Sequence, residues 1–429
     1  MEFVVRRLFI GRATLLGCAL AGLWATPASA DSDARLFTSA NFELSADVRM
    51  VIVDGEKSWV DGGYGKLRSG SGENSRVQPQ LGNAALVWKP QFTWSLGAIV
   101  VGQVEGGQRT QAGVSQAYLE FRPMRSSKIA FSARAGLMWP PVSLEHEGAD
   151  WHVKSSITPS AINSWIGEEV KPLAAEATLF VNVGDEKVRA SAALIAANDT
   201  AGTLLTFRGW ALHDRTTLAF RSQPLPPLGP LTGIQAPETH PLNDVHEGFA
   251  KHLGYYSKLA WQPPLPVRIE LFHYDNRANP EDSTLALVPE WGWRTRFDDV
   301  GVVADLGSGT QLKAQAMQGR TRMGYPMLAK RWVDERFRAG YVMLSRPFGK
   351  VAIAVRADAF DTRNRGSLWT NEYDEHGWAG LVAAKRDWDH VTGLIEFLHI
   401  WSDTPAREYL GEEERQPQTE IQAELRMHW

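Results

Sequence analysis

Charged side chains at alternating positions are the residues of this sequence whose types and spacing could do chemistry. Arginines fill the polar positions of several alternating runs, and carboxylates gather in one stretch, residues 140–173. The candidates in the alternating runs are Arg134, Arg189, Arg208, Arg268, Arg338, Arg356 and Asp358. The candidates in the stretch are Glu145, Glu147, Asp150, Glu168 and Glu169. Arginines facing acids across a confined space would produce a transverse field, which orders water and selects solutes by charge.

Motifs of nucleophilic, metal or phosphate chemistry are absent from the sequence. The 11 histidines form neither a His-Glu-x-x-His pair nor a zinc-binding spacing. There is no Gly-x-x-x-x-Gly-Lys-Ser/Thr phosphate loop, and Ser69–Gly72 is typical of a flexible loop tip rather than a nucleophile elbow. The sequence therefore predicts that the chain is not an enzyme and uses no metal and no cofactor.

The first 30 residues have the pattern of a signal peptide. Three arginines precede an apolar core from Ala13 to Trp24, and Ala28-Ser29-Ala30 forms a small-x-small cleavage site. The only cysteine, Cys18, lies inside this segment, which also loosely matches a lipoprotein box and a twin-arginine signal. The formal net charge of −4 argues against nucleic acid as a partner. We expect residues 31–429 to form one exported domain.

Period-two alternation of apolar and polar residues recurs along this domain and predicts β-strands with unlike faces. Residues 42–52 set the pattern, and the connections between such runs alternate between short and long. Short turns are expected at 89–90, 123–127, 183–186, 213–214, 262–266, 347–350 and 386–389. Long connections are expected at 53–80, 105–113, 140–173, 197–202, 222–250, 276–288, 320–334, 361–376 and 402–417. This layout predicts a transmembrane antiparallel β-barrel of about 18 strands; 16 strands remain an alternative because the stretch 290–319 is ambiguous.

The last residues, 419–429, alternate strictly and end in an aromatic, Trp429. In this the sequence resembles the Gram-negative outer-membrane β-barrel family, whose members typically end in such a strand, read by the barrel-assembly machinery. The resemblance implies an outer-membrane location, surrounding lipid, short turns facing the periplasm and long loops facing outside. Aromatic side chains that fit an interfacial girdle are Trp88, Phe92, Phe121 and Trp261, with Trp401 at the opposite rim.

The stretch 140–173 is the third long connection, and here the layout resembles that of the porins. In that family the third loop folds into the lumen, often with a short helix, and narrows the channel. Thr158-Pro159 is a suitable helix start and Gly167 a suitable end. The resemblance implies passive diffusion of small hydrophilic solutes and is compatible with a homotrimer. It makes the acids of 140–173 constriction residues and the arginines of the runs, with Asp358, pore-wall residues.

Two other interpretations remain open at this point. A structural barrel plugged by its own salt bridges would have the same lumenal charges, and the stretch 140–173 would then carry acids without a specific role. A soluble periplasmic all-β protein that binds polysaccharide would use its 17 tryptophans as sugar platforms. Such a protein needs neither a terminal aromatic strand nor alternating connection lengths.

Overall fold

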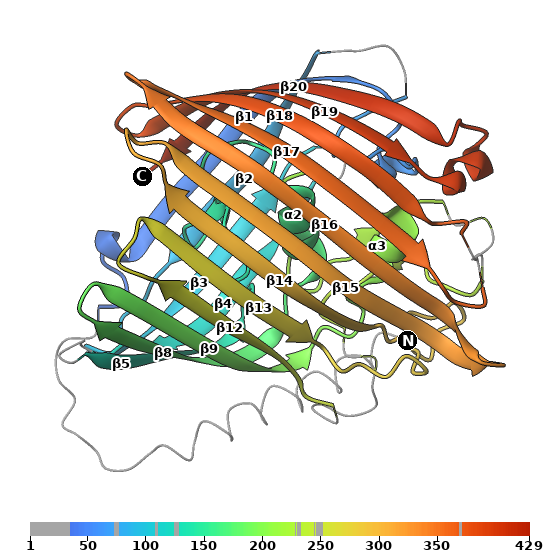
Figure 1. Ribbon diagram of the computed structural model, residues 1–429, viewed down its shortest axis with the longest axis horizontal. Helices are drawn as coiled ribbons and strands as arrows, with labels where there is room; N and C mark the ends of the chain where they lie inside the picture. The colour runs from blue at the N-terminus through green and yellow to red at the C-terminus, as the bar shows by residue number, and fades with distance from the viewer. Residues whose placement is uncertain are drawn as a thin grey trace.

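The computed structural model describes residues 35–72, 77–107, 110–123, 128–227, 229, 233–243, 245, 252–368 and 371–429. The predicted signal peptide therefore lies outside the described residues. The chain forms a closed antiparallel barrel of 16 strands, seen from the side in Figure 1. The barrel strands are β1 (Phe42–Asp54), β2 (Val77–Trp88), β3 (Leu96–Glu105), β4 (Gln111–Phe121), β5 (Ile129–Leu137), β8 (Leu173–Val183), β9 (Glu186–Ala197), β12 (Gly254–Gln262), β13 (Val267–Asp275), β14 (Arg294–Asp305), β15 (Gln311–Met327), β16 (Lys330–Phe348), β17 (Val351–Asn364), β18 (Glu375–Asp387), β19 (Val391–Asp403) and β20 (Arg415–His428).

The barrel closes where the first strand pairs with the last. Arg49 of β1 lies directly opposite Glu424 of β20, and the two strands stay in register from Ser45 to Asp54. The backbone of Trp429 exchanges two hydrogen bonds with Leu44, with N···O distances of 2.9 and 3.0 Å. This seam leaves the sheet without a free edge.

The strand number is 16 rather than about 18 because the segment 203–221 is not a strand pair. The expected turn at 213–214 belongs to a connection that runs from 198 to 253, inside which Thr203–Arg208 form the short helix α3. This segment is apolar because it is buried inside the barrel, with Leu204 and Leu205 fully inaccessible, and not because it faces lipid. The ambiguous stretch 290–319 is strand on both sides of a short turn. The expected connection 320–334 is also mostly strand, since β15 and β16 meet at residues 328–329.

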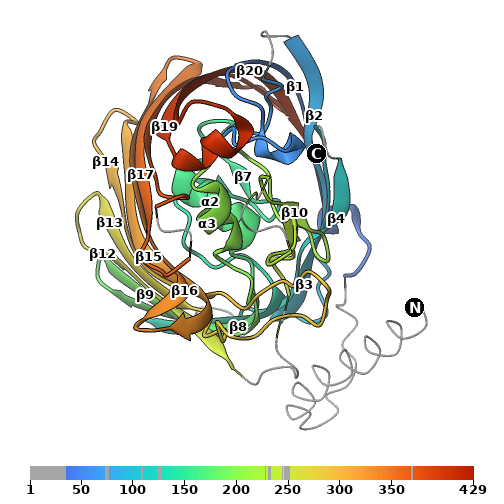
Figure 2. The same ribbon diagram turned by 90° about the vertical axis from the view of Figure 1, so that its right-hand side faces the viewer.

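Connections of two kinds lie at opposite ends of the barrel, as expected. Short turns and both ends of the described chain lie at one end, and the longer connections lie at the other, together with the tight turn at 328–329 (Figure 1). We call 55–76 loop 1, 138–172 loop 3 and 198–253 loop 4. Loop 3 contains β6 (His146–Glu147), β7 (His152–Val153) and α2 (Ala161–Glu169), and loop 4 also contains β10 (Gln223–Pro224) and β11 (Glu238–Thr239). The view along the barrel in Figure 2 places α2 and α3 inside the ring of strands.

The two faces of each strand differ as the alternation predicts. In β17, Val355 is 50% exposed on the outer face, whereas Arg356 is 1% exposed on the inner face. Large apolar side chains stand exposed around the outer face, among them Met50, Val300, Val342, Val382, Ile395 and Leu425. Such a continuous apolar exterior is typical of a surface that contacts lipid. No helix in the described part of the chain has the length and apolar character needed to cross a bilayer.

Three 3₁₀ helices complete the described secondary structure. They are η2 (Ser39–Asn41), η3 (Trp59–Asp61) and η4 (Pro405–Leu410). Helix η3 belongs to loop 1, and its Trp59 is fully buried. Loop 1 therefore also contributes to the packed interior.

Candidate functional site in the barrel lumen

The inner wall has an apolar half and a charged half. Strands β12–β16 supply the apolar half through inward aromatic rings, namely Tyr256, Phe272, Tyr274, Phe297 and Phe337. The rings of Tyr274 and Phe297 stack with centroids 5.0 Å apart. Strands β1 and β20 supply the charged half through Asp47, Arg49, Glu420, Gln422 and Glu424, all of which are buried.

Helix α2 of loop 3 packs against the apolar half. All nine of its residues are buried, and Trp165 contacts Phe297 and Phe337 edge-on, at centroid distances of 5.4 and 5.2 Å. The hydroxyl of Ser160 caps the helix by accepting from the N–H of Asn163. The helix begins two residues after the expected Thr158-Pro159, and it continues past Gly167 to Glu169.

The wall residues Arg356 and Asp358 hold the beginning of α2 in place. The guanidinium of Arg356 lies 2.8 Å from Asp358 and 3.0 Å from Glu145 of loop 3, and it also donates to the carbonyl of Pro159. Asp358 accepts from the N–H of Ala161 at 3.2 Å. Burial alone would raise the pKa of Glu145, but Arg356 and the hydrogen bonds donated by Ser160 and Asn163 outweigh it and lower the pKa. These predicted wall and constriction residues meet, and they join loop 3 to the barrel.

Two neighbouring carboxylates at the end of α2 have opposite electrostatic environments. Glu168 forms an ion pair with Arg208 of loop 4 and lies 3.1 Å from His213. The charge of Arg208, together with the contact to His213, outweighs the cost of burial and lowers the pKa of Glu168 to about 2. Glu169 is equally buried but accepts only from neutral donors, including the N–H of Leu204. Burial therefore raises its pKa to about 7.

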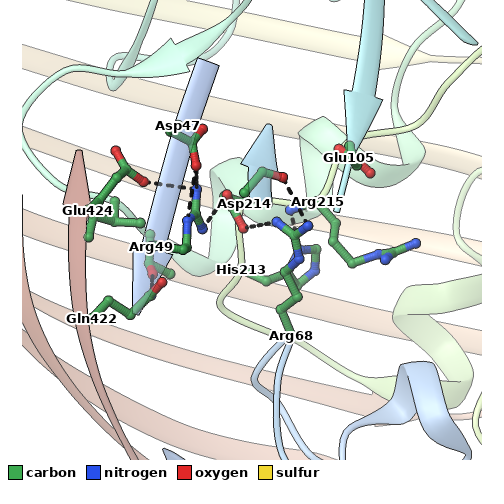
Figure 3. A network of polar contacts seen from close by, with 12 residues as sticks. Asp47, Arg49, Arg68, Glu105, His213, Asp214, Arg215, Gln422 and Glu424 are labelled. Carbon is green, nitrogen blue, oxygen red and sulfur yellow. Dashed lines mark hydrogen bonds and ion pairs between the residues drawn. The ribbon is translucent and has the colours of Figure 1, made fainter. Parts of the chain in front are cut away.

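The part of loop 4 that carries Asp214, which we call its tip, contacts the charged half of the wall. Asp214 lies 2.8 Å from Arg49 of β1 and 2.8 Å from Arg68 of loop 1. Figure 3 shows that Arg49 also faces Asp47 and Glu424, at 2.7 and 2.9 Å. Burial opposes ionisation of Asp214, but the two arginines outweigh it and hold its pKa well below the ordinary value. One buried network thus joins the barrel seam, loop 1 and loop 4.

Three predicted wall arginines gather near the end of the barrel that carries the short turns. Arg134, Arg189 and Arg268 line a hollow of about 430 Å³, which also contains Glu120, Glu176, Lys258 and Glu270 and is bounded by Pro141 of loop 3. Arg134 pairs with Glu176 at 2.8 Å, and Arg268 pairs with Glu270 at 2.7 Å. The guanidinium of Arg189 lies 5.5 Å from the centre of the Phe180 ring. We call this hollow the vestibule.

The remaining predicted residues lie elsewhere. Arg338 points outward from β16, with a side chain that is 65% exposed, so it does not line the lumen. Arg208 lies inside the lumen, but on loop 4 rather than on the wall. Glu147 forms an exposed pair with Lys154, and Asp150 accepts from Ser45 at 2.9 Å. The described residues contain no group of three metal-ligating side chains.

Several lumenal residues were not singled out from the sequence. Asp47, Arg49 and Glu424 occupy polar positions of alternating runs, so their inward direction was readable. Their partner Asp214 was assigned to a turn outside the lumen. Nothing local in the sequence indicates that these residues meet.

Comparison with known proteins supports the fold. The chain is similar to an OmpT variant lacking loop L8, an outer membrane protein of Vibrio cholerae, with 7% identity over 90% of this chain and 99% of that chain and a TM-score of 0.51. Other matches are OmpF of Salmonella typhi in complex with daunomycin (7% identity, 92% and 100% covered, TM-score 0.49) and an anion-selective porin from Comamonas acidovorans (10%, 92% and 100%, 0.47). No family model and no curated protein matches the sequence. At 7% identity the first of these matches concerns the fold alone: the chain has the fold of an outer-membrane β-barrel.

Proposed function

We propose that the protein is an outer-membrane channel through which small hydrophilic solutes diffuse passively. The observation that carries this proposal is the inversion of polarity: the closed barrel exposes an apolar exterior and keeps ionised pairs inside. In lipid every backbone polar group needs a partner, and a closed barrel provides one. A soluble binding protein, the rival interpretation, has no use for such an exterior.

Loops 1, 3 and 4 determine which solutes could pass. Helix α2 packs against the apolar half, and the side chains of the charged half are buried as well. In this proposal a solute would enter the vestibule and move along the charged half, because polar side chains there can replace its water. Both regions contain cations and anions close together, which favours small polar solutes over apolar ones. We expect a narrow channel with low conductance, and no catalytic activity.

A plugged structural barrel is the second candidate. The complete burial of α2 and α3, with 9 and 6 buried residues respectively, favours it. In that case the buried pairs would stabilise the plug and would conduct nothing.

Single-channel recordings in planar bilayers separate these two functions. The wild-type chain should give discrete conductance steps. Arg189→Gln removes a vestibule cation and should shift the reversal potential in a salt gradient toward cation preference. The matched control Arg346→Gln removes an outward, exposed arginine and should leave the potential unchanged. Absence of steps from a correctly folded wild-type barrel would favour the plugged barrel.

The membrane location and the orientation belong to the same proposal. We infer that the short turns face the periplasm, that Trp429 is read by the barrel-assembly machinery and that lipid surrounds the barrel; a homotrimer is compatible with this arrangement. Ser71 lies exposed in loop 1, and Asp389 lies exposed in the turn between β18 and β19. In a chain whose other cysteine is removed or replaced, Ser71→Cys should react with a membrane-impermeant reagent on intact cells and Asp389→Cys should not. Equal labelling would contradict the orientation.

A further inference from the structure

Four arginines form a row on the outer face of the barrel. Arg296, Arg320, Arg336 and Arg363 occupy directly paired positions on β14, β15, β16 and β17. Their inward neighbours are buried, for example Thr295 and Glu335 at 0% exposure, so the alternation directs the arginines outward. The row borders a hollow of about 620 Å³ on the outer surface of the barrel, which Arg338, Arg365 and two acids, Asp298 and Asp361, also line.

The protein neutralises this row only in part. Arg320 pairs with Asp334, and Arg363 lies 3.3 Å from Asp361, which also pairs with Arg338. The side chains of Arg296 and Arg336 form no hydrogen bond and no ion pair with any residue that the structure describes. Arg336 lies between two further arginines, and like charges at directly opposite positions destabilise a sheet. The row is therefore arranged to receive an external anion.

The position of the row along the barrel indicates the kind of anion. Below it, toward the short turns, the outer face becomes apolar, with Val300, Val342 and Val355 between 41% and 53% exposed. On β16 the apolar outward side chains Val342 and Leu344 lie between Arg338 and Arg346, so these two arginines bound the apolar stretch. Arg336 of the row lies two residues beyond Arg338 and ten residues from Arg346, which corresponds to about 25 Å along the barrel axis for a strand tilted by about 40°. The hydrophobic band of such barrels is also about 25 Å tall, so the row lies at the level of lipid headgroups.

We propose that this arginine row binds the phosphate groups of a lipid in the outer leaflet of the membrane. Planar guanidinium groups match phosphate oxygens with paired hydrogen bonds, and neighbouring arginines can hold two phosphates on one headgroup. The acyl chains of the same lipid would cover the apolar stretch below. The proposal rests on the proposed membrane location but does not require that the barrel conducts.

Native mass spectrometry of the full chain in detergent micelles tests this proposal, with diphosphoryl lipid A as the probe. The double variant Arg296→Gln/Arg336→Gln should bind the probe about tenfold more weakly than wild type, because two charge-assisted contacts are lost. The matched control Arg346→Gln/Arg386→Gln removes two outward arginines at the opposite rim and should bind as wild type does. A dephosphorylated glycolipid should not distinguish the three proteins.

Stability measurements provide an independent result. In phosphate-free detergent the double variant should unfold at the same or a higher temperature than wild type, because like-charge repulsion is relieved. The probe should then stabilise wild type more than the variant. Equal binding by both proteins, or equal protection by inorganic phosphate alone, would overturn the proposal. A changed oligomeric state of the double variant with unchanged lipid binding would also overturn it and would indicate a protein interface instead. Heat-modifiable migration, measured in parallel, reports on barrel folding separately.

Discussion

Helix α2 and the tip of loop 4 fill the same lumen but meet walls of opposite character. Trp165 of α2 lies among aromatic rings, and Asp214 of loop 4 lies between arginines. Apolar packing of this kind depends on shape and area, and is nearly indifferent to salt and pH. A buried ionic contact is favourable only while every charge keeps its partner. The apolar contact of Trp165 therefore resembles a fixed core, whereas the position of Asp214 in the lumen depends on charge balance.

The largest effect on the free energy of unfolding should come from removing the apolar contact of Trp165. Trp165→Ala removes the ring between Phe297, Phe337 and Trp210, and we expect a loss of about 3–5 kcal/mol in the free energy of unfolding. Urea titration of the folded barrel would measure it. Trp94→Ala is the matched control, because that ring is 68% exposed. Equal losses in the two variants would show that α2 is not a packed core element.

A smaller effect should follow removal of one charge from the network. Asp214→Asn leaves Arg49 and Arg68 without one shared carboxylate, while Arg49 keeps Asp47 and Glu424. We expect the free energy of unfolding to fall by about 1–3 kcal/mol. The cost is smaller than for a fully buried pair, because the side chain of Asp214 is 18% exposed and solvent screens its charge. If the charged half conducts, the ion preference should also shift toward anions. Asp389→Asn in an exposed turn should change neither quantity, and an identical response in both variants would contradict the buried network.

The smallest effect should come from Glu169, and its pH dependence should be opposite to that of the adjacent Glu168. The lowered pKa of Glu168 means that its contribution to stability is present above about pH 4.5 and is lost as the pH falls toward 2. The raised pKa of Glu169 means that its contribution is lost as the pH rises from about 4.5 through 7. The free energy of unfolding of Glu169→Gln should therefore exceed that of wild type by about 1 kcal/mol at about pH 8, and by little at about pH 4.

Glu168→Gln is the matched partner and should lose stability at neutral pH, because it leaves Arg208 buried without its carboxylate. Thermal unfolding across this pH range would measure both variants. Parallel pH curves for the two variants would show that the environments of these carboxylates do not differ as described.

Local patterns in the sequence predicted the barrel, and non-local contacts explain what they missed. Strand alternation has a period of two residues, so runs such as 42–52 reveal their faces directly. Local residues predicted a helix in loop 3, but its cap is Ser160 and not the expected Thr158. Loop 4 was misread as two strands because a segment buried inside a lumen has the same apolar composition as one that faces lipid.

The direction of Arg338 was misread for a related reason. The polarity of a side chain indicates whether it faces the lumen or the exterior only where the exterior is apolar. At the level of the lipid headgroups, both faces of β16 carry charged side chains. The inner face there is itself partly aromatic, as Phe337 shows. The partners of Asp214 could not be predicted at all, because Arg49 and Arg68 are separated from it by 165 and 146 residues in sequence.

The seam between β1 and β20 has a consequence for the order of assembly. It joins Ser45–Asp54 to residues 419–428, so nearly the whole chain must be present before the two strands pair. Contacts this distant in sequence form slowly, because the entropy of closing the intervening chain is lost first. Arg49 lies in this seam and is bound simultaneously by Glu424 and by Asp214. We therefore expect loop 4 to enter the lumen before or during closure, so that the folding rate, and not only the final stability, depends on Asp214.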